Sequence, residues 1–279
     1  MLTYRGLLDD ATTQLFESSD TPRIDAELLL LHVIEQPLAW LIAYGETQAS
    51  GEHVKTFYKF IKQRHAGQPV AYLVGKRDFW TLSLKVNSDV LIPRPDTETL
   101  VEQALEVLPR DTELDVLDLG TGSGAIALAI AKERPMAKVL AVDSQNAALK
   151  VAQENAQLNQ IHNVTFIQSN WFSDIADVTG FDLIASNPPY VEAGDPHLDQ
   201  GDLRFEPQSA LVAGGKGLDD IQHIVHTSAK YLQNDGWLFI EHGSTQSSEV
   251  AALFEAEGFN SIKLQQDISG LPRCTYGQR

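Results

Sequence analysis

The sequence predicts an α/β protein, in which helices cover both faces of a mostly parallel β-sheet. From residue 114 onward, short apolar runs typical of buried strands alternate with segments of helical period. A glycine-rich turn, Asp118 to Gly124, joins the first apolar run to the first of these helices. A second turn, Asn187-Pro188-Pro189-Tyr190, ends the fourth run. Ligands of doubly wound sheets bind where the parallel strands end, so we expect both turns at one functional edge.

The first 75 residues predict a small helical bundle. Between Leu7 and Phe16 apolar residues recur at helical spacing, and Pro22 stands where a second helix is expected to begin. Further patterns predict a third helix ending near Gly45 and a fourth over residues 52–66. We interpret the lysines of the fourth helix as a solvated face, with a docking surface for an acidic or ribonucleoprotein partner as the alternative.

In residues 76–92 the apolar residues no longer recur at helical spacing, and their pattern predicts a hairpin linker. Their apolar residues fit two short strands with a turn between them. The stiff segment Ile92-Pro93-Arg94-Pro95 follows, and Asp96 or Thr97 is expected to cap a helix through about Leu108. An interdomain hinge is the simplest interpretation of this segment, and residues 93–279 are expected to form the second domain.

Seven strands are expected in this second domain, with helices between them. The strands are predicted at residues 114–119, 138–143, 164–168, 181–186, 237–241, 261–265 and 274–277. The helices are predicted at residues 125–134, 147–158, 217–232 and 247–257. The last two strands are expected to close the sheet as an antiparallel pair.

Composition narrows the class of protein. The chain has 279 residues, of which 43% are hydrophobic, as in an ordinary globular protein. Residues 1–92 carry 9 basic and 11 acidic residues, whereas residues 93–279 carry 12 and 27, a net of −15 that disfavours nucleic-acid binding. No apolar run approaches the roughly 20 residues of a membrane span and no signal peptide is found, so we expect a cytoplasmic protein. The single cysteine, Cys274, excludes a disulfide framework and a cysteine-based metal cluster, and we assign no metal.

The turn from Gly120 to Gly124 is predicted to bind a nucleotide-like cofactor. Its glycines permit a tight turn and let a ligand approach the backbone closely. Asp143 ends the second strand about 20 residues further on, where an acid would bind ribose hydroxyls. Trp171 follows the third strand, where its ring would lie against an adenine while Asn170 bonds the polar edge; a surface aromatic is the alternative. The glycine turn and Asp143 alone fit NAD and S-adenosylmethionine about equally well.

The turn that begins at Asn187 is predicted to hold a planar –NH2 group. Proline fixes its own φ and keeps the preceding residue extended, so Asn187 is held at the carboxyl end of a strand. The Asn187 side-chain oxygen and the Pro188 carbonyl form a fork of two acceptors, which suits the two donors of an –NH2 group. Tyr190 supplies an aromatic face for a flat group. A capped strand end is the alternative, because Asn-Pro is a common turn signal.

The two turns together favour a methyltransferase that uses S-adenosylmethionine. The glycine motif is a compact Asp-x-Gly-x-Gly-x-Gly, and no second dinucleotide-binding half follows it. The acceptor fork ends the fourth strand, where a methyl group would be presented.

On these motifs the chain resembles the HemK/PrmC family, the N5-glutamine methyltransferases of class-1 peptide chain release factors. The resemblance covers essentially the whole chain. It also rests on Arg77-Asp78-Phe79-Trp80, on Ile92 to Glu98 and on Arg204-Phe205-Glu206-Pro207. Ile-Pro-Arg-Pro and Phe-Glu-Pro, in this order, are the most specific of these motifs.

The resemblance implies a class I methyltransferase fold, Rossmann-like, preceded by an N-terminal substrate-recognition domain. It implies S-adenosylmethionine as cofactor, S-adenosylhomocysteine as product, release factors as protein partners and no direct nucleic-acid binding, and we expect a monomer. By position, the cofactor would contact Gly120, Thr121, Gly122, Ser123, Gly124, Asp143, Asn170, Trp171 and Asn187. The substrate glutamine would contact Asn187, Pro188, Pro189 and Tyr190, of which Asn187, Pro188 and Tyr190 would be catalytic. Relatives often carry an acid where this chain has Asn170.

Two rival functions remain open from the sequence. Asn-Pro-Pro-Tyr also suits the exocyclic amines of flipped bases, so a nucleic-acid N-methyltransferase is one rival. A non-catalytic adaptor that binds release factors or ribosomes through residues 1–75 is the other.

Two further groups of residues are candidates for a site. His223 and His226 stand three positions apart on a predicted helix, but they lack a third metal ligand. Glu241-His242 ends a strand near the expected ligand edge, where a role in lining the pocket is an alternative.

Overall fold

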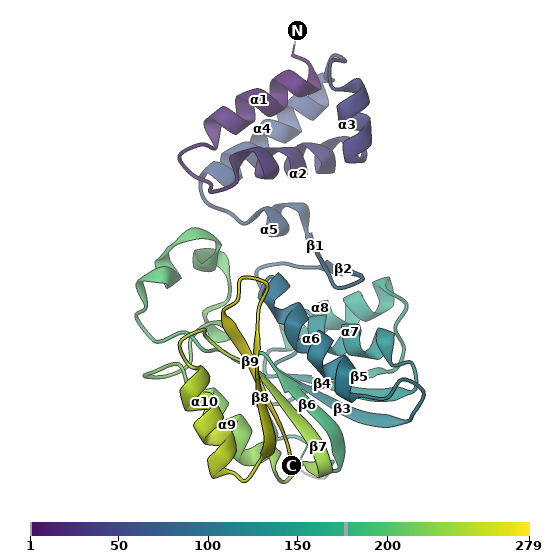
Figure 1. Cartoon of the computed structure of the whole chain (residues 1–279). Helices are drawn as coiled ribbons and strands as arrows, with labels where there is room; N and C mark the ends of the chain where they lie inside the picture. The colour runs from purple at the N-terminus through teal and green to yellow at the C-terminus, as the bar shows by residue number, and fades with distance from the viewer. Residues whose placement is uncertain (1, 176–177) are drawn as a thin grey trace. The chain divides into compact units, whose positions relative to one another are not determined.

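The computed structural model describes residues 2–175 and 178–279, and within them the main sheet has seven strands. These are β3 (Leu114–Leu119), β4 (Ala137–Asp143), β5 (Val164–Gln168), β6 (Phe181–Ser186), β7 (Leu232–Glu241), β8 (Asn260–Gln266) and β9 (Pro272–Gln278). They lie in the order β5-β4-β3-β6-β7-β9-β8 (Figure 1). The first five pair in parallel, and β9 pairs antiparallel with β7 and β8. The predicted α/β fold, with its antiparallel closing pair, is confirmed.

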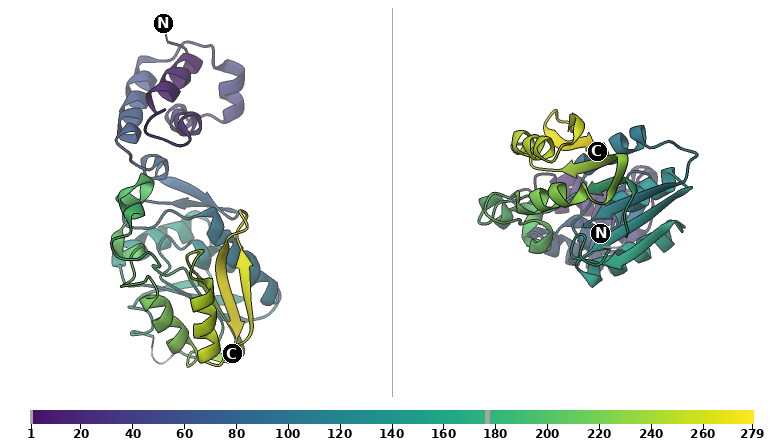
Figure 2. Two further views of the ribbon diagram at one scale, coloured as in Figure 1. Left: turned by 60° about the vertical axis from the view of Figure 1, so that its left-hand side comes forward. Right: turned by 90° about the horizontal axis from the view of Figure 1, so that it is seen from below.

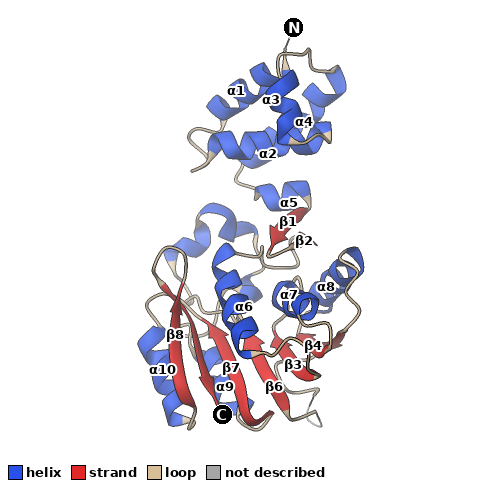
Figure 3. Ribbon diagram, turned by 45° about the vertical axis from the view of Figure 1, so that its right-hand side comes forward, coloured by secondary structure: helices blue, strands red, loops and turns tan. Residues whose placement is uncertain are grey.

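Helices cover both faces of this sheet because both faces are apolar. In β3, Val116 belongs to one buried cluster and Leu117 to the other, since successive residues of a strand point to opposite faces. The first cluster contains residues of α6 (Pro95–Val107), α7 (Ala125–Glu133) and α8 (Asn146–Leu158) (Figure 3). The second contains residues of α9 (Asp219–Ser228) and α10 (Ser247–Ala256). α10 lies against β8 and β9, as Figure 2 also shows.

The helix predicted over residues 217–232 is shorter in the structure. α9 ends at Ser228, and β7 already begins at Leu232, which pairs with Phe181 of β6. The prediction was wrong at this end because pairing in the sheet decides the conformation of Leu232, which local periodicity does not show. The predicted hairpin is confirmed as β1 (Lys76–Phe79) and β2 (Leu82–Lys85).

The N-terminal segment folds as a bundle around its own core. Its helices are α1 (Tyr4–Gln14), α2 (Pro22–Ile34), α3 (Leu38–Tyr44), α4 (Gly51–His65) and α5 (Val70–Val74). Leu7, Leu29 and Phe57 lie at the centre of this core. Phe16 follows the end of α1 and is 75% exposed, so its place in the predicted apolar face was wrong.

A buried arginine joins two helices of this bundle to a segment 138 residues further along the chain. Arg64 of α4 lies 2.6 Å from Asp25 of α2 and 2.8 Å from Asp202, which belongs to the short 3₁₀ helix η2 (Gly201–Phe205). The Arg64 and Asp25 side chains are only 12% and 8% exposed. The Arg23–Asp9 pair is instead largely exposed. Removing one partner of a buried ion pair lowers the stability of a protein strongly, whereas an exposed ion pair contributes little to stability.

By contacts the described chain groups into two units. One comprises Met1–Lys76 and Pro196–Phe205, and the other comprises Arg77–Asp195 and Glu206–Arg279. The hairpin thus groups with the larger unit from Arg77 onward, and a segment from within residues 93–279 groups with the smaller. The predicted domain boundaries stay a prediction.

Length and apolarity identify no single membrane-spanning helix in the described residues. Only α2 and α3 together meet these criteria, as a pair bent by 91°.

Candidate active site

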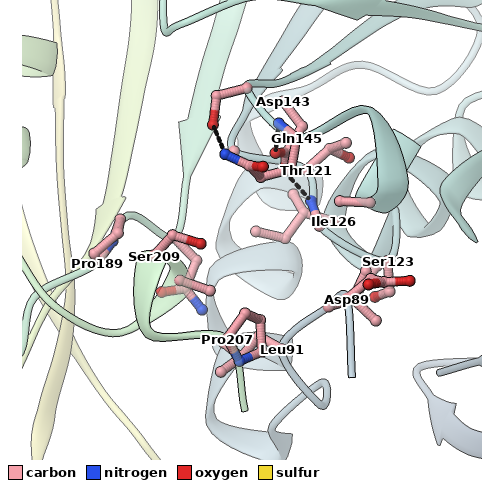
Figure 4. A pocket seen from close by; sticks show the side chains of 18 of the residues that line it. Asp89, Leu91, Thr121, Ser123, Ile126, Asp143, Gln145, Pro189, Pro207 and Ser209 are labelled. Carbon is pink, nitrogen blue, oxygen red and sulfur yellow. Dashed lines mark hydrogen bonds between the residues drawn. The ribbon is translucent and has the colours of Figure 1, made fainter. Parts of the chain in front are cut away.

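A cavity of about 250 Å³ lies where β3, β4, β5 and β6 end (Figure 4). Its lining includes Leu91, Pro93, Arg94, Thr97, Gly120, Thr121, Gly122, Ser123, Asp143, Gln145, Asn170, Trp171, Asn187, Pro189, Pro207, Ser209 and Asp220. The structure therefore brings the glycine turn, Asp143 and the turn at Asn187 to one space. Gly124, Pro188 and Tyr190 are predicted site residues that stand outside this lining. Which of these residues contact ligands stays a prediction.

The glycine turn between β3 and α7 requires glycine at Gly120. This residue has a φ of 71°, a left-handed conformation that side chains disfavour. A Cβ atom there would also lie 3.2 Å from Cζ3 of Trp171. A Cβ atom at Gly122 would meet nothing within 4 Å. The turn thus packs against an aromatic ring at one glycine and leaves the backbone accessible at another.

Asp118, near the end of β3, holds the glycine turn in place. Its Oδ2 accepts hydrogen bonds from the Thr121 hydroxyl at 2.6 Å and from the Ala127 N–H at 3.2 Å. Burial raises the pKa of Asp118 to about 7, although these two hydrogen bonds lower it. Among the described residues its Oδ1 has no hydrogen-bond partner. Asp118 therefore links the turn to the first residues of α7, a role that its place in the motif did not reveal.

Asp143, at the end of β4, is held by backbone donors. Its Oδ2 accepts from the Gly122 N–H at 2.9 Å, and its Oδ1 accepts from the Gln145 N–H at 2.8 Å. Burial raises the pKa of Asp143, and these hydrogen bonds lower it. Each carboxylate oxygen can accept more than one hydrogen bond, so Asp143 can still accept from a ligand hydroxyl. The geometry fits the predicted role of a ribose-binding acid.

Trp171 is fixed in a strained backbone conformation. Its φ is 51°, and its Nε1 donates to Asp220 of α9 at 3.2 Å. Left-handed conformations of bulky residues persist where surrounding contacts hold them, often at functional sites. The ring lines the cavity beside Gly120, and the exposed Asn170 lines it too. No motif in the sequence indicates Asp220, because it stands 49 residues from Trp171.

The turn after β6 places Asn187 at the cavity. The Ser186 hydroxyl donates to the Leu119 carbonyl at 2.8 Å, which ties the ends of β6 and β3 together. The Asn187 Nδ2 donates to the Thr97 hydroxyl of α6 at 3.2 Å. The Tyr190 carbonyl accepts from the Gln246 side chain at 3.0 Å, and burial raises the pKa of the Tyr190 phenol. The backbone of Asn187 is therefore fixed by the end of β6, and its side chain is fixed by the hydrogen bond to Thr97.

The two most specific sequence motifs meet in the structure. Arg94 forms an ion pair with the buried Glu206, which also accepts from the Ile92 N–H at 3.4 Å. Arg94 and Pro207 line the cavity. The Ile-Pro-Arg-Pro and Phe-Glu-Pro segments therefore form part of the cavity wall together, which the hinge interpretation did not predict.

The three histidines considered as site residues, His223, His226 and His242, lie outside the cavity lining. His242 is buried, where its ring nitrogens bond to the Thr275 hydroxyl at 2.8 Å and the Gly243 carbonyl at 2.9 Å. Burial lowers the pKa of His242. His226 pairs with Glu257 at 2.8 Å. In the part of the chain that the structure describes, no group of three His, Cys, Asp or Glu side chains is arranged to hold a metal.

Two family models match this chain. A model described as PrmC N-terminal domain matches residues 6–75, and one described as Methyltransferase small domain matches residues 97–216. A release factor glutamine methyltransferase from Aliivibrio fischeri is 48% identical over 278 residues, which cover 99% of this chain and 98% of the relative. The chain belongs to the release factor glutamine methyltransferase family. The resemblance predicted from the motifs is thus confirmed.

Other members of the release factor glutamine methyltransferase family also match this chain over nearly its full length. The Escherichia coli protein is 45% identical over 99% of both chains, and the Coxiella burnetii protein is 44% identical over 100% of both. Full coverage means that the N-terminal bundle and the larger unit occur together in these relatives.

Solved structures show that the fold is shared more widely than the family. A Pyrococcus furiosus methyltransferase has a TM-score of 0.55 at 16% identity and covers 79% of this chain and 98% of its own. A Thermus thermophilus 16S rRNA methyltransferase in complex with AdoMet and guanosine has a TM-score of 0.56 at 19% identity, over 73% of this chain and 49% of its own. At these identities the likeness shows the fold alone, because one fold serves many substrates.

Proposed function

We propose that this chain transfers a methyl group from S-adenosylmethionine to the side-chain amide nitrogen of the glutamine in the Gly-Gly-Gln motif of class-1 release factors. The 48% identity to a release factor glutamine methyltransferase, over nearly all of both chains, carries the proposal. The cavity supports it, because the glycine turn and Asn187 line the same space. Release factors are then the protein partners, and we propose that the chain acts on them as a cytoplasmic monomer.

The cofactor is assigned to the cavity beside the glycine turn. Asp143 would accept hydrogen bonds from the ribose hydroxyls, and the Trp171 ring would pack against the adenine. Asn170 would accept from the adenine amine through its side-chain oxygen, since an amide oxygen can replace the acid that relatives often carry. When bound, S-adenosylmethionine supplies an electrophilic methyl group on a sulfonium.

The acceptor fork would orient the substrate nitrogen. An amide nitrogen is a weak nucleophile, because its lone pair is delocalised into the carbonyl, so the enzyme must orient it more than deprotonate it. The Asn187 side-chain oxygen and the Pro188 carbonyl would accept its two N–H bonds. Positive charge grows on the nitrogen during transfer and strengthens both hydrogen bonds in the transition state. Positioning of this kind can supply roughly 7–11 kcal/mol. The methylated nitrogen then carries a positive charge and releases its proton to solvent, so no His or Cys base is required.

Peptide mass spectrometry on purified, unmethylated release factor tests the proposal directly. After incubation with this protein and S-adenosylmethionine, we expect one added methyl group on the Gly-Gly-Gln glutamine. A release factor with alanine at that glutamine is the control and should gain nothing. No gain on the normal release factor, with cofactor binding intact, would overturn the proposal. Transfer of labelled methyl groups to RNA or DNA would then identify the rival function, with the steep salt dependence that phosphate contacts produce.

A further inference from the structure

Glu241 is a buried acid directly behind the proposed acceptor fork. It is the last residue of β7 and is only 2% exposed. It lies outside the lining of the cavity. Ser186 of β6 pairs with Ile240 of β7, so Asn187 and Glu241 come next along these neighbouring strands, at the same edge of the sheet. The side chains of Thr97 and Asn187 both lower the pKa of the Glu241 carboxyl. Its Oε2 atom is buried without a partner among the described residues.

This arrangement determines which end of the Asn187 amide faces the cavity. A primary amide carries one acceptor oxygen and one donor –NH2 group, whereas an ionised carboxylate can only accept. The –NH2 group of Asn187 must therefore point toward Glu241 and Thr97, and its Nδ2 lies 3.2 Å from the Thr97 hydroxyl oxygen. That hydroxyl can accept from Asn187 while it donates to Glu241. The Asn187 oxygen is then left for the cavity.

We propose that Glu241 is a positioning residue for methyl transfer: with Thr97, it holds the Asn187 amide so that its oxygen accepts from the substrate –NH2 group. This inference rests on the proposed function of the cavity. The reversed amide would present an –NH2 group to another –NH2 group, and two donors cannot form a hydrogen bond. Glu241 thus acts on the substrate only through Asn187.

The charge state of Glu241 controls how strongly the orientation of the Asn187 amide is fixed. Burial raises the pKa of Glu241 to about 7, while Thr97, Arg273 and Asn187 lower it and Asp96 raises it further. Tyr190 and Cys274 also face Glu241, and its charge raises the pKa of both. Above this pKa the carboxylate accepts only. Below it, the protonated acid can donate to the Asn187 oxygen and thereby permits the reversed amide.

Steady-state kinetics on the full-length enzyme and release factor test the inference. The substrate amide does not titrate between pH 6 and 8, so a change of kcat in this range must come from ionisable groups of the proteins. We expect kcat of the wild type to fall as the pH is lowered through about 7, and we expect this fall to disappear in Glu241→Gln. Thr97→Val should lower kcat about 10- to 100-fold, the effect of losing one directed buried hydrogen bond, with KM for S-adenosylmethionine unchanged. Thr97→Ser keeps the hydroxyl and should retain most of the activity.

A second readout does not depend on methyl transfer. The side-chain –NH2 signal of Asn187 in a ¹⁵N-correlation spectrum, assigned by its loss in Asn187→Ala, should shift with a midpoint near pH 7 in the wild type and stay constant in Glu241→Gln. If the wild type fails to methylate release factor but this signal titrates, the proposed function fails and the positioning of Asn187 stands. If methylation occurs, a wild-type pH profile in Glu241→Gln, a constant Asn187 signal or full kcat in Thr97→Val would overturn the inference.

Discussion

Replacing Asp118 by asparagine should change how the stability of the larger unit depends on pH. Burial raises the pKa of this carboxyl from 3.8 to about 7. Between these values the folded protein retains a proton that the unfolded chain has released, so the free energy of unfolding of the wild type falls as the pH rises from about 4 to about 7. A difference of about three pH units corresponds to about 4 kcal/mol, of which about 3 kcal/mol falls between pH 5 and pH 8.

The Asp118→Asn variant removes this titration while it preserves the local contacts. The asparagine oxygen can accept from Thr121 and Ala127 as Oδ2 does, and its –NH2 group takes the place of Oδ1. We expect the stability of the variant relative to wild type to rise by about 3 kcal/mol from pH 5 to pH 8. Urea unfolding followed by tryptophan fluorescence at both pH values measures this difference. Asp115→Asn, which changes an exposed carboxyl on the same strand, is the control. The reasoning is refuted if Asp118→Asn and wild type show the same dependence on pH.

Three further substitutions probe the fork, the glycine turn and the N-terminal bundle. Asn187→Ala should lower kcat about 10²- to 10³-fold, the effect of losing one directed polar group, and a rise in KM alone would contradict this role. Gly120→Ala should reduce stability by about 1–2 kcal/mol, because alanine disfavours a left-handed backbone; calorimetry should also show weaker binding of S-adenosylhomocysteine, and normal affinity would speak against a cofactor at this turn. Asp25→Ala should destabilise the bundle by up to about 3 kcal/mol, because it removes one of the two carboxylate partners of the buried Arg64 and leaves only Asp202. Asp9→Ala, at an exposed pair, should change stability by less than about 1 kcal/mol in the same thermal unfolding experiment.

Much of the fold could be predicted because the signals that specify it are local. The period of apolar residues distinguishes strands from helices within a few residues, and the alternation of the two indicates a parallel sheet. The glycines from Gly120 to Gly124 and the two prolines after Asn187 restrict the backbone directly, so both turns could be located at strand ends. These local motifs also identified the family, which full-length relatives confirm. The end of α9 could not be predicted in this way, since pairing with β6 decides it.

Which distant side chains meet was decided by the tertiary structure alone. Asn187 reaches Thr97 across 90 positions of the sequence, and Arg94 reaches Glu206 across 112. Neither pair leaves a periodic or short-range signal, because the order of the strands in the sheet and the packing of α6 bring them together. Burial raises the pKa of Glu241 to about 7, and burial exists only once the strands and helices have assembled. The chain carries its reactive groups in local motifs, whereas the orientation of an amide and the charge of a buried acid depend on neighbours that only folding supplies.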